Sequence, residues 1–286
     1  MPKNVYGFRQ INEQFKDING RGRYYSGFRV MYGLSKRLTV MTMIGGSNHH
    51  LKKVPSDFTS YLLNHHKITY PIFPFLTEGV HGYAKYRILS IDREKKHFRV
   101  AIYSEVTKSF VAHTEGESNL MTDNSGYGGG LIFTKLYKRF AASFTSGFIK
   151  SLPYTQQNDL YKLTFKSGDV LVNNLSLGYR IYPRTFANYK DININLYAEI
   201  INRRYLSATI YYDGVPFDYS FIKDNGAIYT YNGFVKNQYT ELRTSVQFIF
   251  NSTSRLDIGF AVPIISRSYL YDYPLVFINI QKYIFK

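Results

Sequence analysis

The strongest constraint on this chain is a pattern of segments of about ten residues in which apolar and polar side chains alternate. In the clearest segment, residues 240–250, Leu242 and Phe248 lie on one face while Glu241 and Arg243 lie on the other. Further segments of this kind are 256–264, 192–200, 98–103 and 140–148. A period of two indicates β-strands whose two faces meet different surroundings, as in a barrel or a sandwich.

Composition agrees with strands and leaves a membrane location open. The chain contains 28 tyrosines and 22 phenylalanines, and aromatic residues favour strands. The mean hydropathy of −0.26 resembles that of a soluble protein, and no apolar stretch reaches the roughly 18 residues of a membrane helix. A spanning barrel keeps its average hydropathy low because its faces alternate. The absence of cysteine excludes disulfides and thiolate metal sites.

The lengths of the connections distinguish a barrel from a sandwich. Connections that are short alternate along the chain with long ones. The short connections are 35–37, 92–96, 137–138, 183–189 and 251–254. The long connections are roughly 47–78, 107–126, 151–168 and 205–237, with a shorter one at 265–273. Outer-membrane barrels combine short periplasmic turns with long extracellular loops. We therefore predict an all-β, closed antiparallel transmembrane barrel that forms a single domain over residues 1–286.

The same alternation predicts the number of strands. Eleven strands can be counted from Tyr24 onward, and the last, 274–285, descends to the periplasm. Closed bacterial barrels have an even number of strands and periplasmic termini. A further strand before Arg21 is therefore required, and residues 3–14 are the candidate although their alternation is poor. The expected total is about twelve.

The charge and the first residues bear on location. The net charge of +16 predicts an anionic neighbour, and lipopolysaccharide phosphates are favoured over nucleic acid because no nucleic-acid fold pattern is present. The first five residues lack the apolar core of a secretory signal. Because a barrel of the bacterial outer membrane must be exported, we expect the numbering to start on a processed or truncated chain.

Several segments resemble a known family. Residues 32–40 (YGLSKRLTV) look like a first tight hairpin, residues 168–171 with 174–180 look like a middle strand, and residues 196–199 place an acidic residue in the next strand. In these features the chain is similar to the transporter-like barrels of the phenol-degradation meta-pathway family, distant relatives of the FadL-type channels. The resemblance implies twelve strands and transport of a hydrophobic or other small solute, and it implies no catalytic residues.

If the apolar faces meet lipid, the opposite faces line a lumen. The charged lumen candidates are Lys85, Arg87, Arg99, Glu105, Arg180, Glu199, Arg203, Glu241, Arg243 and Asp257. These side chains either form a paired ladder that plugs a narrow barrel or line an anion-selective pore. Charges of both signs on similar strands favour pairing.

Two groups of loop residues are candidates for contacts. An apolar loop sequence and two tyrosines of the 205–237 connection suit a partner surface, and the contact candidates are Tyr70, Ile72, Phe73, Phe75, Tyr211 and Tyr212. The apolar loop residues can also pack inward, and a partner or inward packing is favoured over entry into the lipid interface. The tyrosines suit the aromatic girdle at the lipid interface equally well. The pairs His49-His50 and His65-His66 lack carboxylate or cysteine neighbours, so we expect no metal.

An enzyme is not expected from the sequence. The histidines on candidate strands, His81 and His97, stand at strand ends with no serine or acidic motif beside them, and no cofactor motif is present. The first functional hypothesis is a barrel that passes or gates a small solute. The alternative is a non-conducting accessory subunit of an outer-membrane secretion or assembly complex. It would contact other outer-membrane proteins through its long loops and outer wall rather than work through its lumen.

Overall fold

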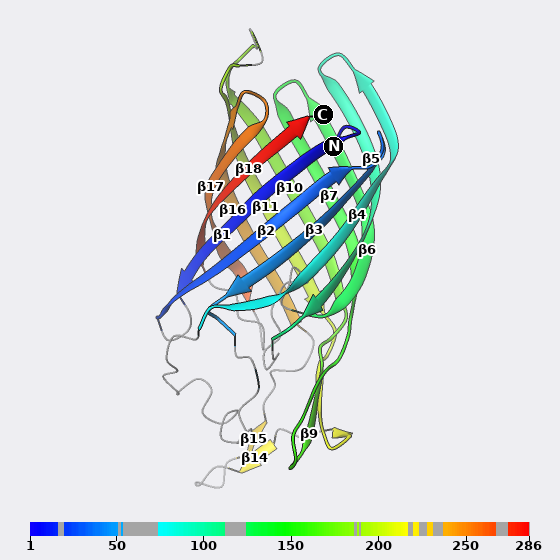
Figure 1. Ribbon diagram of the computed structural model, residues 1–286, viewed down its shortest axis with the longest axis vertical. Helices are drawn as coiled ribbons and strands as arrows, with labels where there is room; N and C mark the ends of the chain where they lie inside the picture. Colours follow the sequence, from blue (N-terminus) through cyan, green and yellow to red (C-terminus); the bar gives the residue numbers. More distant parts are fainter. Residues whose placement is uncertain are drawn as a thin grey trace.

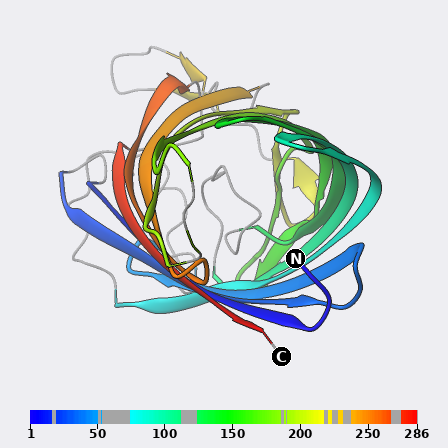
Figure 2. The ribbon, with the colours of Figure 1, turned by 90° about the horizontal axis from the view of Figure 1, so that it is seen from above.

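The computed structural model shows a closed barrel whose strands tilt around a central lumen (Figures 1 and 2). It describes residues 1–16, 20–50, 53, 74–111, 124–185, 188, 190–216, 220–222, 228–230, 237–266 and 274–285. Twelve strands form the barrel: β1 (Val5–Lys16), β2 (Gly22–Gly33), β3 (Leu38–Ser47), β4 (Leu76–Arg93), β5 (Lys96–Ser109), β6 (Gly126–Tyr137), β7 (Phe140–Ser151), β10 (Val170–Tyr182), β11 (Asn193–Tyr205), β16 (Asn237–Phe250), β17 (Ser254–Ser266) and β18 (Leu275–Phe285).

All neighbouring strands of the barrel are antiparallel, and the first strand closes on the last. β1 pairs with β2 on one side and with β18 on the other, in a register that runs from Val5↔Phe285 to Phe15↔Leu275. The predicted closed barrel of twelve strands is confirmed. The strand that loop parity required before Arg21 is β1, two residues further along than the predicted 3–14.

Two of the long connections contain strands of their own. The connection after β7 holds β8 (Tyr154–Gln157) and β9 (Lys162–Lys166), and the one after β11 holds β12 (Thr209–Tyr212) and β13 (Val215–Pro216). These four form one sheet in the order β13-β12-β9-β8, and β14 (Ser220–Ile222) pairs with β15 (Ile228–Thr230). Leu163 and Ile210 are buried, so one face of the four-stranded sheet is covered.

The two rims of the barrel differ as the connection lengths predicted. The termini and the short turns lie at one end, and the extra sheets lie at the other (Figure 1). At the short-turn end, Asn4 N donates to Gly33 O and Tyr283 N donates to Thr253 O, which ties both chain ends to neighbouring turns. We call these ends the short-turn rim and the long-loop rim.

The outer face of the barrel wall is apolar and the inner face is polar. On β18 the outward Ile278 and Ile280 are 49% and 56% exposed, whereas the inward Asn279 between them is 6% exposed. Outward aromatic side chains also gather near the rims, with Tyr86, Tyr137 and Tyr179 at the short-turn end and Tyr24 and Tyr127 at the other. An apolar outer band between aromatic girdles is typical of barrels that span a membrane. Within the described ranges, no helix is long and apolar enough to cross a membrane.

Inward aromatic rings lie over glycines one or two strands away. A Cβ built on Gly178 would lie 2.8 Å from the Tyr197 ring, and one built on Gly147 would meet the Tyr103 hydroxyl. Gly178 and Tyr197 are register partners across β10 and β11. The missing Cβ leaves room for each ring to lie flat on the wall, which is a recognised way of packing glycines in sheets.

Candidate functional site in the barrel lumen

One part of the lumen is filled by a hydrogen-bonded group of charged side chains. Arg243 lies between two carboxylates: its Nε donates to Glu241, and its Nη1 donates to Glu13 Oε1 at 3.0 Å. Tyr239 donates to the second oxygen of Glu241 at 2.7 Å. Glu241 is 1% exposed, so its charge is compensated by these partners rather than by water.

A second set of bonds continues on the same side, nearer the short-turn rim. Arg9 donates to Asp257 Oδ2 at 3.2 Å, and Gln247 donates to Asp257 Oδ1 at 2.7 Å. Asn195 and Tyr197 donate in turn to Gln247 Oε1 at 3.3 and 3.4 Å. We call the two sets together the paired network. It spans β1, β11, β16 and β17 and contains three of the charged lumen candidates, Glu241, Arg243 and Asp257.

The opposite part of the wall carries small side chains instead. β6, β7 and β10 point Gly128, Gly130, Gly147 and Gly178 inward, because these residues are register partners of lumen-facing positions on adjacent strands. Ser143 on β7 and Ser176 on β10 are register partners, and both also point inward. Small side chains leave space on this side of the lumen, whereas large, paired side chains fill the other side.

A cavity of about 400 Å³ lies inside the barrel between the β2–β5 wall and this small-residue wall. It is lined by Arg29, Met31, Thr39, Met41, His81, Tyr83, Lys85, Tyr103, Glu105, Ile132, Thr145, Ile149, Val172, Asn174 and Arg203. We call it the cationic cavity, because basic side chains outnumber carboxylates in its lining.

The lining of the cationic cavity contains more basic than acidic side chains. Arg29, Lys85 and Arg203 are basic, whereas the one carboxylate of the lining, Glu105, lies 3.1 Å from His81 Nε2. Burial places these charges in a medium of lower dielectric constant than water, which strengthens their effect on a solute. The cavity therefore favours an anion or the negative end of a dipole.

Two tyrosines form an aromatic surface beside these charges. The rings of Tyr83 and Tyr103 stack with centroids 5.5 Å apart and an interplanar angle of 21°. Their hydroxyl groups can donate hydrogen bonds to an anion, while the ring faces offer apolar contact. Chemically, the cavity can hold a small solute that carries negative charge and an apolar part.

The ten lumen candidates divide by position. Lys85, Glu105 and Arg203 line the cationic cavity, and Glu241, Arg243 and Asp257 belong to the paired network. The remaining four are Arg87, Arg99, Arg180 and Glu199. Arg87 donates to Lys36 O, Arg99 donates to Asp92, Arg180 lies close to the β10–β11 turn, and Glu199 is the register partner of Arg243.

Sequence reasoning missed several lumen residues. Arg9 and Glu13 were missed because β1 carries polar side chains on both faces, so its sequence does not show which face points into the lumen. Arg29, Tyr83 and Tyr103 alternate with outward apolar residues in the same way as Lys85. The strand parity that selected Lys85 would have found them had it been extended to β2 and to uncharged positions.

The tip of the β4–β5 hairpin holds a separate polar cluster beyond the membrane-spanning part. β3 pairs with β4 only as far as Tyr86, whereas β4 runs on to Arg93. At the tip, Asp92 accepts hydrogen bonds from Ser90, His97 and Arg99 at 2.7, 2.6 and 3.1 Å. The bonds from Ser90 and His97, together with Arg99, lower the pKa of Asp92 to about 2.

We expect the Asp92 cluster to be insensitive to mild acid. Because the folded pKa lies below the unfolded value of about 3.9, the cluster favours the hairpin above that value and is lost as the pH falls through about 2. A titration of Asp92 by carboxyl ¹³C chemical shift should give a midpoint near 2. In the H97A variant the midpoint should rise towards the unfolded value, and a wild-type midpoint near 4 would show that the cluster does not form.

The loop candidates are only partly described. Phe75 is 58% exposed, and Tyr212 is 38% exposed and stacks on Tyr161 with ring centroids 5.6 Å apart. Tyr211 pairs with Thr164 across β12 and β9. Tyr70, Ile72, Phe73, His65 and His66 lie outside the described residues.

The first histidine pair lies at the long-loop rim beside a buried carboxylate. His50 Nε2 is 3.5 Å from Glu78 Oε1, and the His49 ring meets Phe15 edge-on. Across the described residues, no group of three or more histidine, aspartate or glutamate side chains could hold a metal ion.

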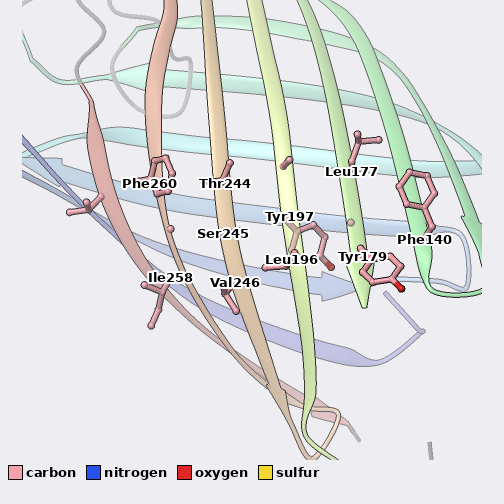
Figure 3. A pocket seen from close by; sticks show the side chains of 14 residues that line it. Phe140, Leu177, Tyr179, Leu196, Tyr197, Thr244, Ser245, Val246, Ile258 and Phe260 are labelled. Carbon is pink, nitrogen blue, oxygen red and sulfur yellow. The ribbon is translucent and has the colours of Figure 1, made fainter. Parts of the chain in front are cut away.

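The outer wall carries an apolar depression of about 600 Å³ on β10, β11, β16 and β17 (Figure 3). Its floor includes Ala198 and Thr244, which are register partners and smaller than the surrounding Leu177, Leu196 and Phe260. The depression lies on the outward face and is separated from the lumen by the strand backbones.

Comparisons with known proteins identify the fold. No protein-family model matches the chain, and no curated protein matches it. The structure is similar to the COG4313 outer membrane channel from Pseudomonas putida F1, with a TM-score of 0.59 and 10% identity over 99% of this chain and 97% of that one. LpxR from Salmonella typhimurium also matches, with a TM-score of 0.39 and 8% identity over 97% of this chain and 99% of that one.

The sequence argument excluded an enzyme, and that exclusion was wrong. The structure does not exclude catalysis, because an acidic residue lies beside each of the two strand histidines. The sequence argument also failed on its own terms, since it assumed that no acidic residue stands beside the strand histidines. Strand pairing places His81 at 3.1 Å from Glu105, and the hairpin turn places His97 at 2.6 Å from Asp92.

The finer resemblance to the phenol-degradation meta-pathway and FadL-type barrels is not confirmed, because no family model matches. At 10% identity, the likeness to the Pseudomonas channel shows the fold alone. That fold is a closed, twelve-stranded outer membrane β-barrel, and the barrels that share it indicate an outer-membrane location.

Proposed function

We propose that this protein is an outer-membrane channel that passes a small, negatively charged solute along the small-residue side of its lumen. The observation that carries the proposal is the cationic cavity, where Arg29, Lys85 and Arg203 face a single carboxylate. Rings of basic side chains select anions in pores. The paired network bonds Arg9 and Arg243 to the carboxylates of Asp257, Glu13 and Glu241, so most of its charge is compensated within the network.

The supporting geometry is the division of the lumen into two parts. Twelve strands leave an interior of modest width, between that of a filled eight-stranded barrel and an open porin. Large paired side chains occupy one part, whereas glycines and serines line the other. A path limited to one side suits small solutes and excludes larger ones. The Pseudomonas protein of similar fold is itself a channel.

The proposal includes an orientation. Barrels of this class place short turns in the periplasm and long loops outside the cell. We therefore place both termini at the periplasmic side and the β8–β9–β12–β13 sheet outside. The net charge of +16 supports contact between the chain and lipopolysaccharide phosphates.

We expect Lys85→Glu to reverse the ion preference of the channel. Lys85 lines the cavity from β4, and the substitution changes the local charge by two units. The anion-to-cation permeability ratio should fall by about tenfold, since a change of about 1.4 kcal/mol in interaction energy suffices for such a factor. The reversal potential of the purified protein in a planar bilayer under a KCl gradient measures this ratio.

The matched control is Lys108→Glu, which makes the same charge change on the outward face of β5. Its permeability ratio should stay at the wild-type value, because the barrel wall separates this position from the path. Equal ratios for Lys85→Glu and the wild type, with conductance intact, would contradict a path through the cationic cavity.

The second candidate is the non-conducting accessory subunit. It is favoured by the paired network, whose buried ion pairs and hydrogen bonds fill part of the lumen as a plug would. Two results together would favour this accessory role over the channel. The folded barrel would show no conductance in the bilayer, and it would co-purify with stoichiometric partners in mild detergent.

A further inference from the structure

The outward face of β1 is polar at a level where its neighbours are apolar. Gln10, Asn12 and Gln14 alternate with the lumen residues Arg9, Ile11 and Glu13, so their side chains point away from the lumen. Ser26 on β2 is the register partner of Asn12 and points outward beside it. We call Gln10, Asn12, Gln14 and Ser26 the amide patch.

Gln10 and Asn12 of the amide patch lie in the middle of β1, and Gln14 lies nearer the long-loop end beside Tyr24. Gln10 is the register partner of Ile280, which is near the midpoint of β18, and Asn12 is the partner of Ile278. Those two isoleucines are 56% and 49% exposed, and Phe28 on the other flank is 45% exposed. By contrast, the outward Asn173 and Asn202 lie close to the long-loop ends of their strands.

Hydrogen bonds within the patch use only part of its capacity. Gln10 Nε2 donates to Ser26 Oγ at 2.7 Å and to Asn12 Oδ1 at 3.4 Å, and Asn12 Nδ2 donates to the Ile278 carbonyl at 3.1 Å. Gln14 donates to the Tyr24 hydroxyl at 3.1 Å. In the described part of the chain, the side-chain oxygens of Gln10 and Gln14 accept no hydrogen bond.

Lipid tails cannot satisfy these groups. An amide that faces hydrocarbon with an unused oxygen loses the hydrogen bonds that it would form in water, and this loss is unfavourable. Within the described residues, Gln10 and Gln14 each keep an unused oxygen, and with Asn12 between them they occupy successive outward positions of one strand. These amides mark a surface that is covered by protein when the barrel is in the membrane. Polar side chains serve in this way as contacts between membrane-spanning elements.

We propose that the amide patch is the interface through which two copies of this chain associate in the membrane. The patch is uncharged, and each amide both donates and accepts hydrogen bonds. An identical patch related by a twofold axis therefore offers matching donors and acceptors, as an isologous contact requires. The exposed apolar side chains of β18 and Phe28 flank the amides and would pack around them.

The chain contains no cysteine, so single cysteines report on this interface directly. In the experiment, Gln10→Cys, Asn12→Cys and Gln14→Cys are made singly and oxidised with copper phenanthroline in native outer membranes. Disulfides form only where two Cα atoms approach to about 4.4–6.8 Å, which near a twofold axis selects the residues closest to the axis. At least one of the three variants should therefore migrate mainly as a disulfide-linked dimer.

The matched control is Leu196→Cys, an outward, mid-strand position on β11 that is 44% exposed and lies on another part of the wall. It should remain monomeric under the same oxidation. A dimer at a patch position, with none at Leu196→Cys, supports the proposal. Monomers throughout, equal dimer at the control position, or a disulfide to a different protein would overturn it.

A second measurement keeps the test independent of cysteine reactivity. The variant Gln10→Leu with Gln14→Leu makes the patch apolar and is expected to shift wild-type dimers to monomers in native mass spectrometry from mild detergent. Heat-modifiable migration of the variant checks that the barrel still folds. A folded variant that keeps the wild-type mass would refute the amide contact, and this result would leave the channel proposal untouched.

Discussion

Replacement of Glu241 by glutamine is expected to lower the free energy of unfolding of the barrel by about 3 kcal/mol, the lower end of what the loss of one partner of a buried ion pair costs. Glu241 is 1% exposed and binds both Arg243 and Tyr239. The substitution keeps the shape of the side chain but removes its charge, so the Arg243 guanidinium is left with Glu13 alone. Urea unfolding in lipid vesicles, followed by tyrosine fluorescence, measures the change.

Glu199→Gln is the matched control. Glu199 also points into the lumen and is the register partner of Arg243, but it is more exposed than Glu241 and makes no side-chain hydrogen bond in the described part of the chain. We expect it to change the stability by less than about 1 kcal/mol. Equal losses for the two variants would show that general lumen charge, rather than the Glu241–Arg243 contact, stabilises this part of the barrel.

Gly130→Ala is expected to be a highly damaging single-methyl change in the wall. A Cβ at this position would overlap with the Ser146 carbonyl oxygen and lie 2.6 Å from Gly147 Cα. These are backbone atoms, which cannot rotate away, so β6 and β7 would have to separate. We expect a loss of about 3 kcal/mol, or no closed barrel, because overpacking by a methyl group against backbone costs at least this order. Heat-modifiable migration and urea unfolding report the two outcomes.

Gly22→Ala is the control for the general effect of glycine replacement. A Cβ at Gly22 meets no atom within 4 Å, and Gly22 opens β2 much as Gly130 lies in the opening half of β6. We expect Gly22→Ala to be neutral or to stabilise the barrel by up to about 1 kcal/mol through the unfolded state. A similar loss at both positions would contradict the steric argument.

Most of the architecture could be predicted because barrel strands are encoded locally. The alternation of Leu242 and Phe248 with Glu241 and Arg243 specifies both the strand and its two faces. Connection lengths then specified the end at which each turn lies. Even β1, whose alternation is hidden by the amide patch, was required by the parity of the other eleven strands. The strands β8, β9, β12 and β13 were not predicted, because they are short and pair across two separate connections.

The candidate site could be predicted only as a list of inward charges. Glu105 and Arg243 were both found, but Glu105 pairs with His81 on β4 and Arg243 pairs with Glu13 on β1, and neither partner is near in the sequence. Which charges are neutralised and which remain depends on strand tilt and register around the closed wall. The same limit explains the failed exclusion of an enzyme, since the residue beside His81 is Glu105, 24 positions away.

The sequence by itself determined the strand faces, the two kinds of rim and the need for a twelfth strand, because each depends on a period or a spacing along the chain. Only the tertiary structure decided how the lumen is divided. Closure of β1 onto β18 brings Arg9 to Asp257 and Glu13 to Arg243, at sequence separations of 248 and 230 residues. The closed wall also gathers Arg29, Lys85 and Arg203 around one cavity, and no local pattern records an arrangement that is set across the barrel.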